Sequence, residues 1–403
     1  MKVCLITGEF PPMQGGVGDF TNELGKALAE LGCEVSVITS TQGQGARDRG
    51  QGVTPIPYPL SIFPIIEKWD WGSWRRIIGL LSEIRPRILH IQYQAAAYGM
   101  HPAINLLPLR LRMGRHPFIR SIHPLTTFHD LKVPYLFPKA GPVRWWVVLA
   151  LARWSDAVIV TNKEDLSKLS SYPLIPNPYL VPIGSNIPPQ PPPGYDRNRW
   201  RSRWGIGPDD LLLSYFGFLN ESKGGEILVR ALERLVRRGY NARLLMVGGK
   251  VGSSDPTNVA YLRKVERLIE ELGLAERVLW TGYTPQAEVS ANLMASDICV
   301  LPYRDGVSFR RGSFMACLAH GLPIVSTKPR VELTELRNGE NILLVPPDAP
   351  IALAEAIARL AEDPELRRRL GEGAARLARN FSWEMIARKT LELYEEVVGA
   401  KRS

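Results

Sequence analysis

The sequence is poor in cysteine and has no long uninterrupted hydrophobic run, and each absence excludes a class of protein. Its 403 residues include four cysteines, and no two of them have the short spacing of a metal-binding pair. All four lie in apolar stretches, so we interpret them as buried thiols in a reducing compartment. They are Cys4, Cys33, Cys299 and Cys317.

The hydrophobic runs are short as well. The longest, residues 145–152, is bounded by Arg144 and Arg153 and is too short to span a bilayer. At the N-terminus only residues 3–6 are apolar before Thr7, which is too few for a secretory signal peptide. We therefore expect a cytoplasmic protein.

Charge is unevenly spread. The formal net charge is +10, and the basic excess leans toward the first half, where it stands beside tryptophan in residues 68–76 and 144–146. This pairing suits an anionic lipid surface, so peripheral contact with the inner face of the plasma membrane is one hypothesis. The alternative, favoured for any single cluster, is that the tryptophans belong to the core and the arginines are solvated. We expect no nucleic-acid partner.

The length of the chain and its 45% hydrophobic content allow two domains with separate cores. Residues 187–194 are rich in proline and can form neither a helix nor a central strand, so we interpret them as a linker. We expect an N-terminal domain at residues 1–187 and a C-terminal domain at residues 188–379. A final helix at residues 380–403 should pack back on the first domain.

Both halves alternate strands with helices, which predicts an α/β fold with an open parallel sheet in each domain. In the first half, an apolar strand at residues 3–7 precedes a glycine-rich turn at residues 15–18 and an amphipathic helix at about 19–31. Glycines would let a ligand reach the start of that helix. The full dinucleotide-binding spacing is missing, and a turn that serves only packing is the alternative.

Polar residues at the ends of further strands are candidate site residues. His90 and Gln92 belong to one expected strand, and a short later strand would deliver His129 and Asp130. The carboxyl ends of parallel strands are where open α/β sheets bind ligands. Each histidine could instead be a structural residue whose ring nitrogens are hydrogen-bonded inside the protein. The strands expected in this region are residues 88–92 and 118–122.

Residues 302–327 combine a basic turn with the start of a helix. An apolar strand at residues 298–301 leads into the turn, and the helix ends at Gly321 before another strand. The guanidiniums of Arg310 and Arg311, with the unpaired amides of a helix start, could receive a doubly charged phosphate group. The alternative is a solvated arginine pair at a helix cap.

In the order of its parts, the chain resembles the family 4 glycosyltransferases over essentially its whole length. The resemblance implies the GT-B fold, in which two Rossmann-like domains have parallel sheets that face one another across a cleft. It also implies sugar transfer with retention of anomeric configuration, in which basic side chains take the place of a metal ion. The matching motifs are residues 15–18, His129-Asp130, Lys223-Gly224, residues 280–283 and residues 295–302.

Two departures from the family pattern stand in the second half. The family usually has an arginine after the glycine that corresponds to Gly217, and this chain has Phe218 there. The family also usually has two glutamates where this chain has Ser308 and Ala316. A subset of the family with an Asp-Gly-Val-Ser and Arg-Arg-Gly-Ser pattern is similar to residues 305–313, which favours a variant enzyme over an inactive one.

The resemblance implies roles for particular residues. We expect Arg310 or Arg311 to compensate for Phe218 at the diphosphate, unless one of them only pairs with Asp305. The expected catalytic residues are His129, Asp130, Lys223 and Arg310. The expected donor-binding residues are Gly16, Asn220, Lys223, Gly282, Tyr283, Asp305, Ser308, Arg310, Arg311, Gly312 and Ser313. The expected acceptor-binding residues are Gly15, Gly16, His90 and Gln92, and we expect neither a metal ion nor a cofactor.

The implied activity is transfer of a hexose from a nucleoside diphosphate sugar to a hydroxyl of a glycan, a lipid-linked molecule or a small molecule. Such an enzyme would serve the synthesis of cell-surface glycans, glycolipids or glycoconjugates. One alternative is a GT-B epimerase or phosphorylase that acts on an activated sugar. Another is a protein that binds a nucleotide sugar without consuming it.

Overall fold

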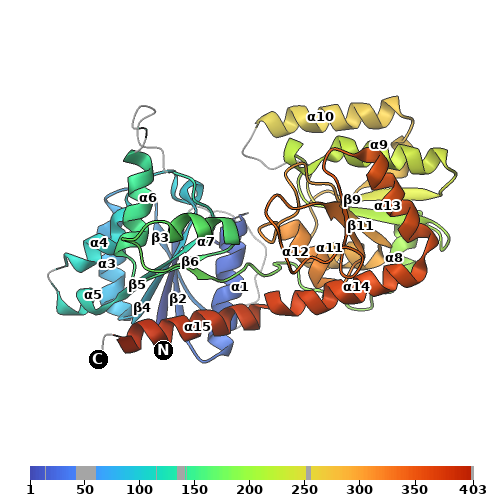
Figure 1. Ribbon diagram of the computed structural model, residues 1–403. Helices are drawn as coiled ribbons and strands as arrows, with labels where there is room; N and C mark the ends of the chain where they lie inside the picture. The colour runs from blue at the N-terminus through green and yellow to red at the C-terminus, as the bar shows by residue number, and fades with distance from the viewer. Residues whose placement is uncertain are drawn as a thin grey trace. The chain divides into compact units, whose positions relative to one another are not determined.

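The computed structural model describes residues 1–13, 15–41, 60–114, 116–133, 141, 143–250 and 256–400. The chain divides into two compact units, and Figure 1 labels many of their helices and strands. Unit 1 contains residues Met1–Gly184 together with Ser382–Ser403, and unit 2 contains Ser185–Phe381. Among the described residues, no helix is both long enough and apolar enough to cross a membrane.

Unit 1 is built on a seven-stranded sheet in which every neighbouring pair of strands is parallel. The strand order is β3-β2-β1-β4-β5-β6-β7. The strands are β1 (Lys2–Thr7), β2 (Glu34–Ser40), β3 (Leu60–Ile66), β4 (Ile88–Tyr93), β5 (His123–Phe128), β6 (Ala157–Val160) and β7 (Tyr179–Leu180). The α-helices are α1 (Gly16–Glu30), α3 (Ser73–Ile84), α4 (Leu107–Arg112), α5 (Pro117–Ser121), α6 (Val143–Trp154), α7 (Lys163–Ser170) and α15 (Trp383–Ala400).

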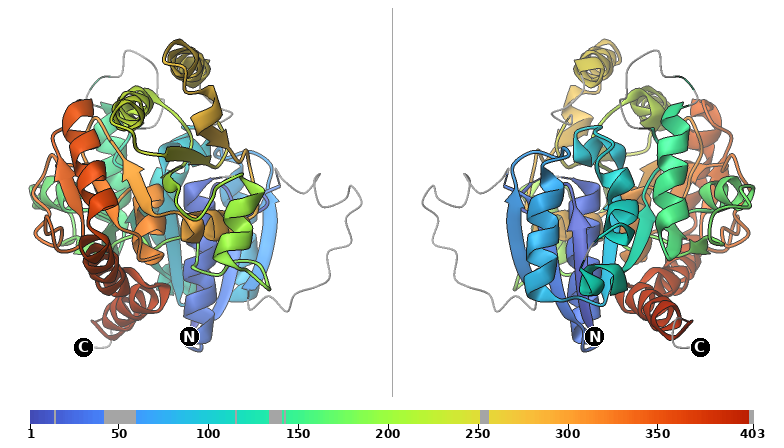
Figure 2. Two further views of the ribbon diagram at one scale, coloured as in Figure 1. Left: turned by 90° about the vertical axis from the view of Figure 1, so that its right-hand side faces the viewer. Right: turned by 90° about the vertical axis from the view of Figure 1, so that its left-hand side faces the viewer.

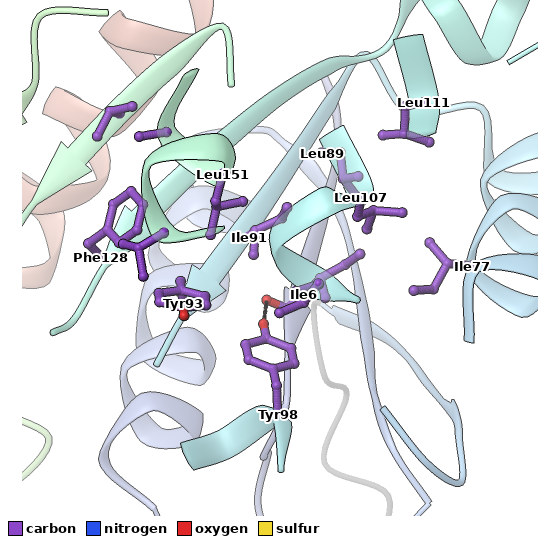
Figure 3. Close-up of a cluster of buried hydrophobic side chains, with 14 of the residues drawn as sticks. Ile6, Ile77, Leu89, Ile91, Tyr93, Tyr98, Leu107, Leu111, Phe128 and Leu151 are labelled. Carbon is purple, nitrogen blue, oxygen red and sulfur yellow. Dashed lines mark hydrogen bonds between the residues drawn. The ribbon is translucent and has the colours of Figure 1, made fainter. Parts of the chain in front are cut away.

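The two faces of this sheet carry separate apolar cores, because successive side chains of a strand point to opposite faces. In β1, Leu5 packs with α1 and α15, whereas Ile6 packs with the helices α3 to α6. Figure 2 shows unit 1 from two further sides. Figure 3 shows the second of these cores, where the Tyr98 hydroxyl donates a hydrogen bond of 3.0 Å to the Ile6 carbonyl. The sheet is therefore covered on both faces, as parallel sheets require.

The strand expected at residues 118–122 is wrong, because this segment forms the short helix α5. Pro117 occupies its first turn, and the His116 ring accepts a hydrogen bond of 3.2 Å from the Phe118 amide. Proline suits the start of a helix because its missing N–H group is not needed there. The strand β5 begins only at His123 and carries the chain to His129.

Unit 2 is built on a six-stranded sheet with the order β10-β9-β8-β11-β12-β13, again parallel throughout. The strands are β8 (Leu211–Phe216), β9 (Ala242–Val247), β10 (Val278–Trp280), β11 (Ile298–Leu301), β12 (Ile324–Thr327) and β13 (Leu343–Val345). The α-helices are α8 (Arg197–Arg203), α9 (Gly225–Arg237), α10 (Pro256–Glu271), α11 (Gln286–Ala295), α12 (Gly312–Ala319), α13 (Pro350–Glu362) and α14 (Pro364–Ala378). Short 3₁₀ turns connect several of these elements; η1 (Ala95–Tyr98) and η2 (Ile104–Leu106) are in unit 1, and η3 (Glu221–Lys223), η4 (Ala275–Arg277) and η5 (Arg379–Phe381) are in unit 2.

Each sheet has a point where the order of its strands reverses. In unit 1 this point is β1, between β2 and β4, and in unit 2 it is β8, between β9 and β11. Ligands of open α/β sheets bind beyond the carboxyl ends of the strands at such a point. The loops after β1 and β8 are therefore the first places to search for a site. The two-sheet α/β architecture confirms the predicted fold class.

Candidate functional site

In unit 2, three residues converge at the end of β8. Gly217 has a φ of +113°, a conformation that favours glycine. A Cβ atom at this position would lie 2.9 Å from Nζ of Lys223 and 3.6 Å from Cβ of Ser313. Lys223 ends the turn η3, and Ser313 lies in the first turn of α12. The missing side chain of Gly217 thus leaves room for an ammonium group beside a helix start.

Lys223 is half-buried, and burial is the main reason why its pKa falls to about 8. The charge of the nearby Arg311 lowers that pKa further. Among the described residues, no carboxylate forms an ion pair with Lys223. A cation that lacks a partner and stands near a second cation favours binding of an anion, because an anion would relieve both burial and repulsion.

Arg311 directly precedes α12 and is held by two neighbours. Its guanidinium forms an ion pair with Asp305, and it lies 4.1 Å from the ring centroid of Tyr303. The Tyr303 hydroxyl is 2.7 Å from Oγ of Ser313. Burial raises the pKa of Tyr303, so this hydroxyl stays protonated. Arg311, Tyr303 and Ser313 therefore form one connected group at the start of α12.

Other expected donor-site residues lie near this group in the sequence or precede it in the turn before Lys223. Arg310 is exposed, whereas Arg311 is half-buried. Ser308 accepts a bond of 3.2 Å from the Arg311 amide through its carbonyl oxygen. Asn220 accepts a bond of 2.9 Å from the Ser222 hydroxyl, which steadies the turn before Lys223. Gly312 is the first residue of α12, and a Cβ atom placed on it would meet no neighbouring atom within 4 Å.

The segment expected to contact the nucleobase follows β10. Gly282 has a φ of +68°, and the Tyr283 side chain is 71% exposed. Two strands away, Phe218 packs against the turn after β9, where a Cβ atom on Gly249 would come within 2.7 Å of its ring. Phe218 thus stands where the family usually has arginine, and its ring packs against the turn at Gly249.

In unit 1, the glycine-rich turn is filled by the protein's own carboxylate. Oε1 of Glu9 accepts hydrogen bonds from the amides of Val17, at 3.1 Å, and Gly18, at 3.4 Å. A Cβ atom on Gly15 would lie 2.0 Å from the same oxygen. By contrast, no atom lies within 4 Å of a Cβ placed on Gly16. Of these glycines, Gly16 is therefore the one that leaves space for a substrate.

The sequence patterns did not identify Glu9 as a candidate site residue. It accepts its hydrogen bonds from residues eight and nine positions later, at the positive end of the α1 dipole. Burial raises the pKa of Glu9, while the two amides oppose that shift. The only indication in the sequence was an acidic residue between a strand end and a glycine turn.

His129 and Gln92 come together from neighbouring strands. Nε2 of His129 is 3.0 Å from Oε1 of Gln92, so this ring nitrogen carries the proton. The ring also meets the edge of Phe20 on α1, with centroids 4.6 Å apart. Burial lowers the pKa of His129 to about 3, which keeps the imidazole neutral at ordinary pH. Gln92 is fully buried, and its Nε2 has no partner among the described residues.

The expectation that His90 binds the acceptor is corrected by the structure. His90 is fully buried, and both ring nitrogens are engaged inside unit 1. Nδ1 is 2.6 Å from the hydroxyl of Tyr394 on α15, and Nε2 is 2.7 Å from Oγ1 of Thr127. His90 is the satisfied structural histidine that the sequence left open as an alternative.

His129 and Asp130, which form one sequence motif, have different partners in the structure. Asp130 is buried, and its Oδ1 accepts a bond of 3.1 Å from the Lys132 amide. Burial is the main reason why the pKa of Tyr93 is raised, and the charge of Asp130 adds to that shift; Tyr93 belongs to the core on the opposite face from α1. Adjacent residues of an extended chain point to opposite sides, so only His129 lies with Gln92.

Two parallel sheets, each with a glycine turn where the order of its strands reverses, define a two-domain α/β architecture. HepE from Anabaena, solved in complex with UDP-glucose, has the same architecture, with a TM-score of 0.73 at 15% identity over 98% of this chain and 100% of that one. At this identity the likeness shows the fold alone, and that fold is GT-B.

Sequence comparison gives the family. Residues 14–184 match Glycosyltransferase Family 4, and residues 196–377 match Glycosyl transferases group 1. The D-inositol 3-phosphate glycosyltransferase of Corynebacterium efficiens is 31% identical, over 100% of this chain and 96% of that protein. The phosphatidyl-myo-inositol mannosyltransferase of Mycolicibacterium smegmatis is 24% identical, over 99% of this chain and 94% of that protein. The chain belongs to the family 4 glycosyltransferases, which transfer a sugar from a nucleotide sugar.

Proposed function

We propose that this protein is a retaining hexosyltransferase that moves a hexose from a nucleoside diphosphate sugar to a hydroxyl of a polyol-containing acceptor. The bond between the anomeric carbon and the phosphate oxygen breaks, and the acceptor oxygen bonds to the same face of that carbon. The acceptor proton passes to the departing phosphate oxygen. No side chain has to act as a nucleophile, and the protein orients the substrates and stabilises the leaving group.

The observation that carries this proposal is the group of cations around Gly217. Lys223 and Arg311 stand close enough for one charge to lower the pKa of the other, and the start of α12 adds its amides. A diphosphate gains charge as the glycosidic bond breaks, so these groups bind the transition state more tightly than the substrate. In this proposal they do so without a divalent ion. Asp305 and Ser308 would contact hydroxyls of the sugar.

The polar residues of unit 1 would contact the transferred sugar and the acceptor. Gln92 has a buried amide nitrogen without a partner among the described residues, and such donors are costly unless something accepts from them. A hydroxyl oxygen of a substrate would satisfy it. The hydrogen bond to Gln92 fixes the His129 ring, so its position is set before the substrate arrives.

The names of the relatives suggest where to look for the acceptor. Both relatives are named for acceptors that contain inositol, one as inositol 3-phosphate and the other as phosphatidyl-myo-inositol. We therefore place inositol and its phosphate esters first among the polyols to be tested.

The experiment is a screen of nucleoside diphosphate hexoses against these polyols with EDTA present, followed by NMR of the products. The expected result is one donor that is consumed faster when an acceptor is added, with the anomeric configuration of the donor kept in the product. An isomerised sugar nucleotide would instead indicate an epimerase. Formation of sugar 1-phosphate only with added phosphate would indicate a phosphorylase. Binding of a nucleotide sugar without its consumption would show that the protein is not an enzyme.

A further inference from the structure

The two cations Lys223 and Arg311 belong to different loops of unit 2. Lys223 ends the turn η3, and Arg311 directly precedes α12. The loop after β11, residues 302–304, contacts both loops. The ring centroid of Tyr303 in this loop is 4.1 Å from the guanidinium carbon of Arg311. The contacts of the same loop with η3 therefore decide where Lys223 stands relative to Arg311.

The backbone of this loop holds the residues on either side of Lys223. The Arg304 amide donates a hydrogen bond of 2.8 Å to the Ser222 carbonyl. Gly224 has a φ of +70°, and a Cβ atom placed on it would lie 2.0 Å from the Pro302 carbonyl oxygen. Only glycine permits so close an approach. Lys223 therefore lies between two residues that are both fixed against the loop after β11.

The side chain of Arg304 adds two ion pairs to this backbone contact. Its Nη1 donates a hydrogen bond of 3.0 Å to Oε1 of Glu221, the first residue of η3. Its Nε donates a bond of 2.7 Å to Oδ1 of Asp348, in the loop between β13 and α13. The planar guanidinium can bind two carboxylates in a fixed geometry. Arg304 thus joins the loops that follow β8, β11 and β13.

These ion pairs contribute more to position than to stability. The side chains of Arg304 and Glu221 are 38% and 74% exposed, so water screens the pair and it adds little to the stability of the fold. The attraction between Lys223 and an anion, however, depends on the distance between them. Lys223 is half-buried, so a movement of η3 would also change its contact with water. We therefore expect loss of Arg304 to weaken anion binding in a protein that is still folded.

We propose that Arg304 is a positioning residue, which acts through Glu221 and the backbone of Ser222 to hold the ammonium group of Lys223 beside Gly217. The anion that Lys223 would meet is the diphosphate of the donor, and in this respect the inference rests on the proposed transferase function. Arg304 acts only through η3, and Lys223 is the group that contacts the diphosphate.

The first test is calorimetric titration with inorganic pyrophosphate, which has the diphosphate of every candidate donor. Arg304→Ala and Glu221→Ala should each weaken binding about fivefold. The double variant should bind no more weakly than either single variant, because both side chains act through one contact. Arg238→Ala is the matched control. It removes an exposed ion pair of 3.1 Å with Glu355 and should keep the dissociation constant within twofold.

Glu221→Ala separates position from charge. Loss of a carboxylate by itself would tighten the binding of an anion and would lower the pKa of a nearby lysine. Loss of position has the opposite effect on both quantities, because an ammonium group that is held less firmly reaches water. The pKa of Lys223 can be followed without any ligand by NMR of its Cε carbon. In Arg304→Ala and in Glu221→Ala it should rise from about 8 toward the usual 10.5.

The inference is overturned if Glu221→Ala binds pyrophosphate as tightly as the unaltered protein or more tightly. In that case a loss confined to Arg304→Ala would mean that Arg304 contacts the anion directly. An unchanged or lower pKa of Lys223 in Glu221→Ala would overturn it as well, as would a fall in melting temperature with no change in binding. Neither measurement needs turnover, so a protein that transfers no sugar would contradict the proposed function and still test the role of Arg304.

Discussion

The loops after β1 and β8 are built alike, but the side chains that fill their glycine turns have opposite charge. In both units a strand at the reversal of strand order leads into a turn with glycine, and the helix α1 or α9 follows. The space beside Gly217 is filled by the ammonium group of Lys223, whereas the space beside Gly15 is filled by the carboxylate of Glu9. A glycine turn therefore shows where a ligand can approach, and the side chain that fills the turn decides the charge of that ligand.

The comparison extends to the groups around each turn. In unit 2, Arg311 adds a second positive charge beside Lys223. In unit 1, the lowered pKa of His129 keeps its ring neutral, and Gln92 is an amide. We infer that unit 2 binds the negatively charged diphosphate and that unit 1 binds hydroxyl groups of the substrates. The predictions below would break or sharpen this division.

The largest effect is expected for His129→Ala in unit 1. The variant should fold and lose about a hundredfold or more in kcat, because a misplaced sugar reacts slowly even when it is bound. His90→Ala is the matched control, since His90 is buried and bonded only inside the protein. It should lower the melting temperature and leave the kcat of the folded enzyme nearly unchanged. Comparable kcat losses in both variants would contradict the separate roles of the two histidines.

A loss of about ten- to a hundredfold in kcat/KM for the donor is expected when Arg310 and Arg311 are both replaced by alanine. Most of it should come from Arg311, because its charge acts on Lys223. Phe218→Arg in the double-alanine background should recover part of the loss in both turnover and donor affinity.

The ion pair with Asp305 provides a sharper control for Arg311. If Arg311 serves only to neutralise Asp305, the variant that combines Asp305→Asn with Arg311→Ala should regain full activity. If Arg311 acts on the diphosphate, this combination should remain impaired. Steady-state kinetics with varied donor distinguishes the two outcomes.

A smaller effect is expected from pH. The pKa of Lys223 lies at about 8, below the usual value of 10.5, so the free enzyme loses this charge as pH rises through 8. A bound diphosphate favours the charged lysine and raises its pKa. Donor affinity should therefore be nearly constant below pH 7 and fall by up to about fivefold between pH 8 and 9. Lys223→Arg should abolish this decline, because arginine stays charged. A decline unaffected by that substitution would assign it to another group.

The smallest effect is expected in lipid binding by the basic surface of unit 1, which comprises residues 68–76 and 144–146. Trp69, Trp74 and Trp145 pack against the core, while Trp71 and Trp146 remain 47% and 64% exposed. If this surface contacts lipid, liposomes with anionic lipid should bind the protein, and added salt should weaken the binding. Trp146→Ala should reduce it a few fold. Equal binding to neutral liposomes would contradict the hypothesis.

The alternation of strands and helices was enough to predict the α/β fold class, because each element has a strong apolar pattern of its own. The segment at residues 118–122 was mistaken for a strand because five residues are too few to separate the two patterns. Pro117 was available as an indication of a helix start.

The candidate site was harder to predict where the hydrogen-bond partner of a residue is distant in the sequence. It was also harder where the role of a residue depends on the direction in which its side chain points. His90 is bonded to Tyr394, which lies 304 residues later in the chain. His129 and Asp130 are adjacent in sequence, but only the structure shows that His129 contacts Gln92 whereas Asp130 accepts a hydrogen bond from the Lys132 amide. Glu9 caps a helix across a turn, and no local pattern identifies such a contact.

The division of charge between the two units is tested most directly by titrating one nucleoside diphosphate into three proteins at the same pH and salt concentration. These are the unaltered protein, Lys223→Ala and Glu9→Ala, measured by calorimetry. We predict that Lys223→Ala weakens binding at least tenfold, whereas Glu9→Ala keeps the dissociation constant within about twofold. Loss of binding in Glu9→Ala with unchanged binding in Lys223→Ala would contradict the assignment of the diphosphate to unit 2.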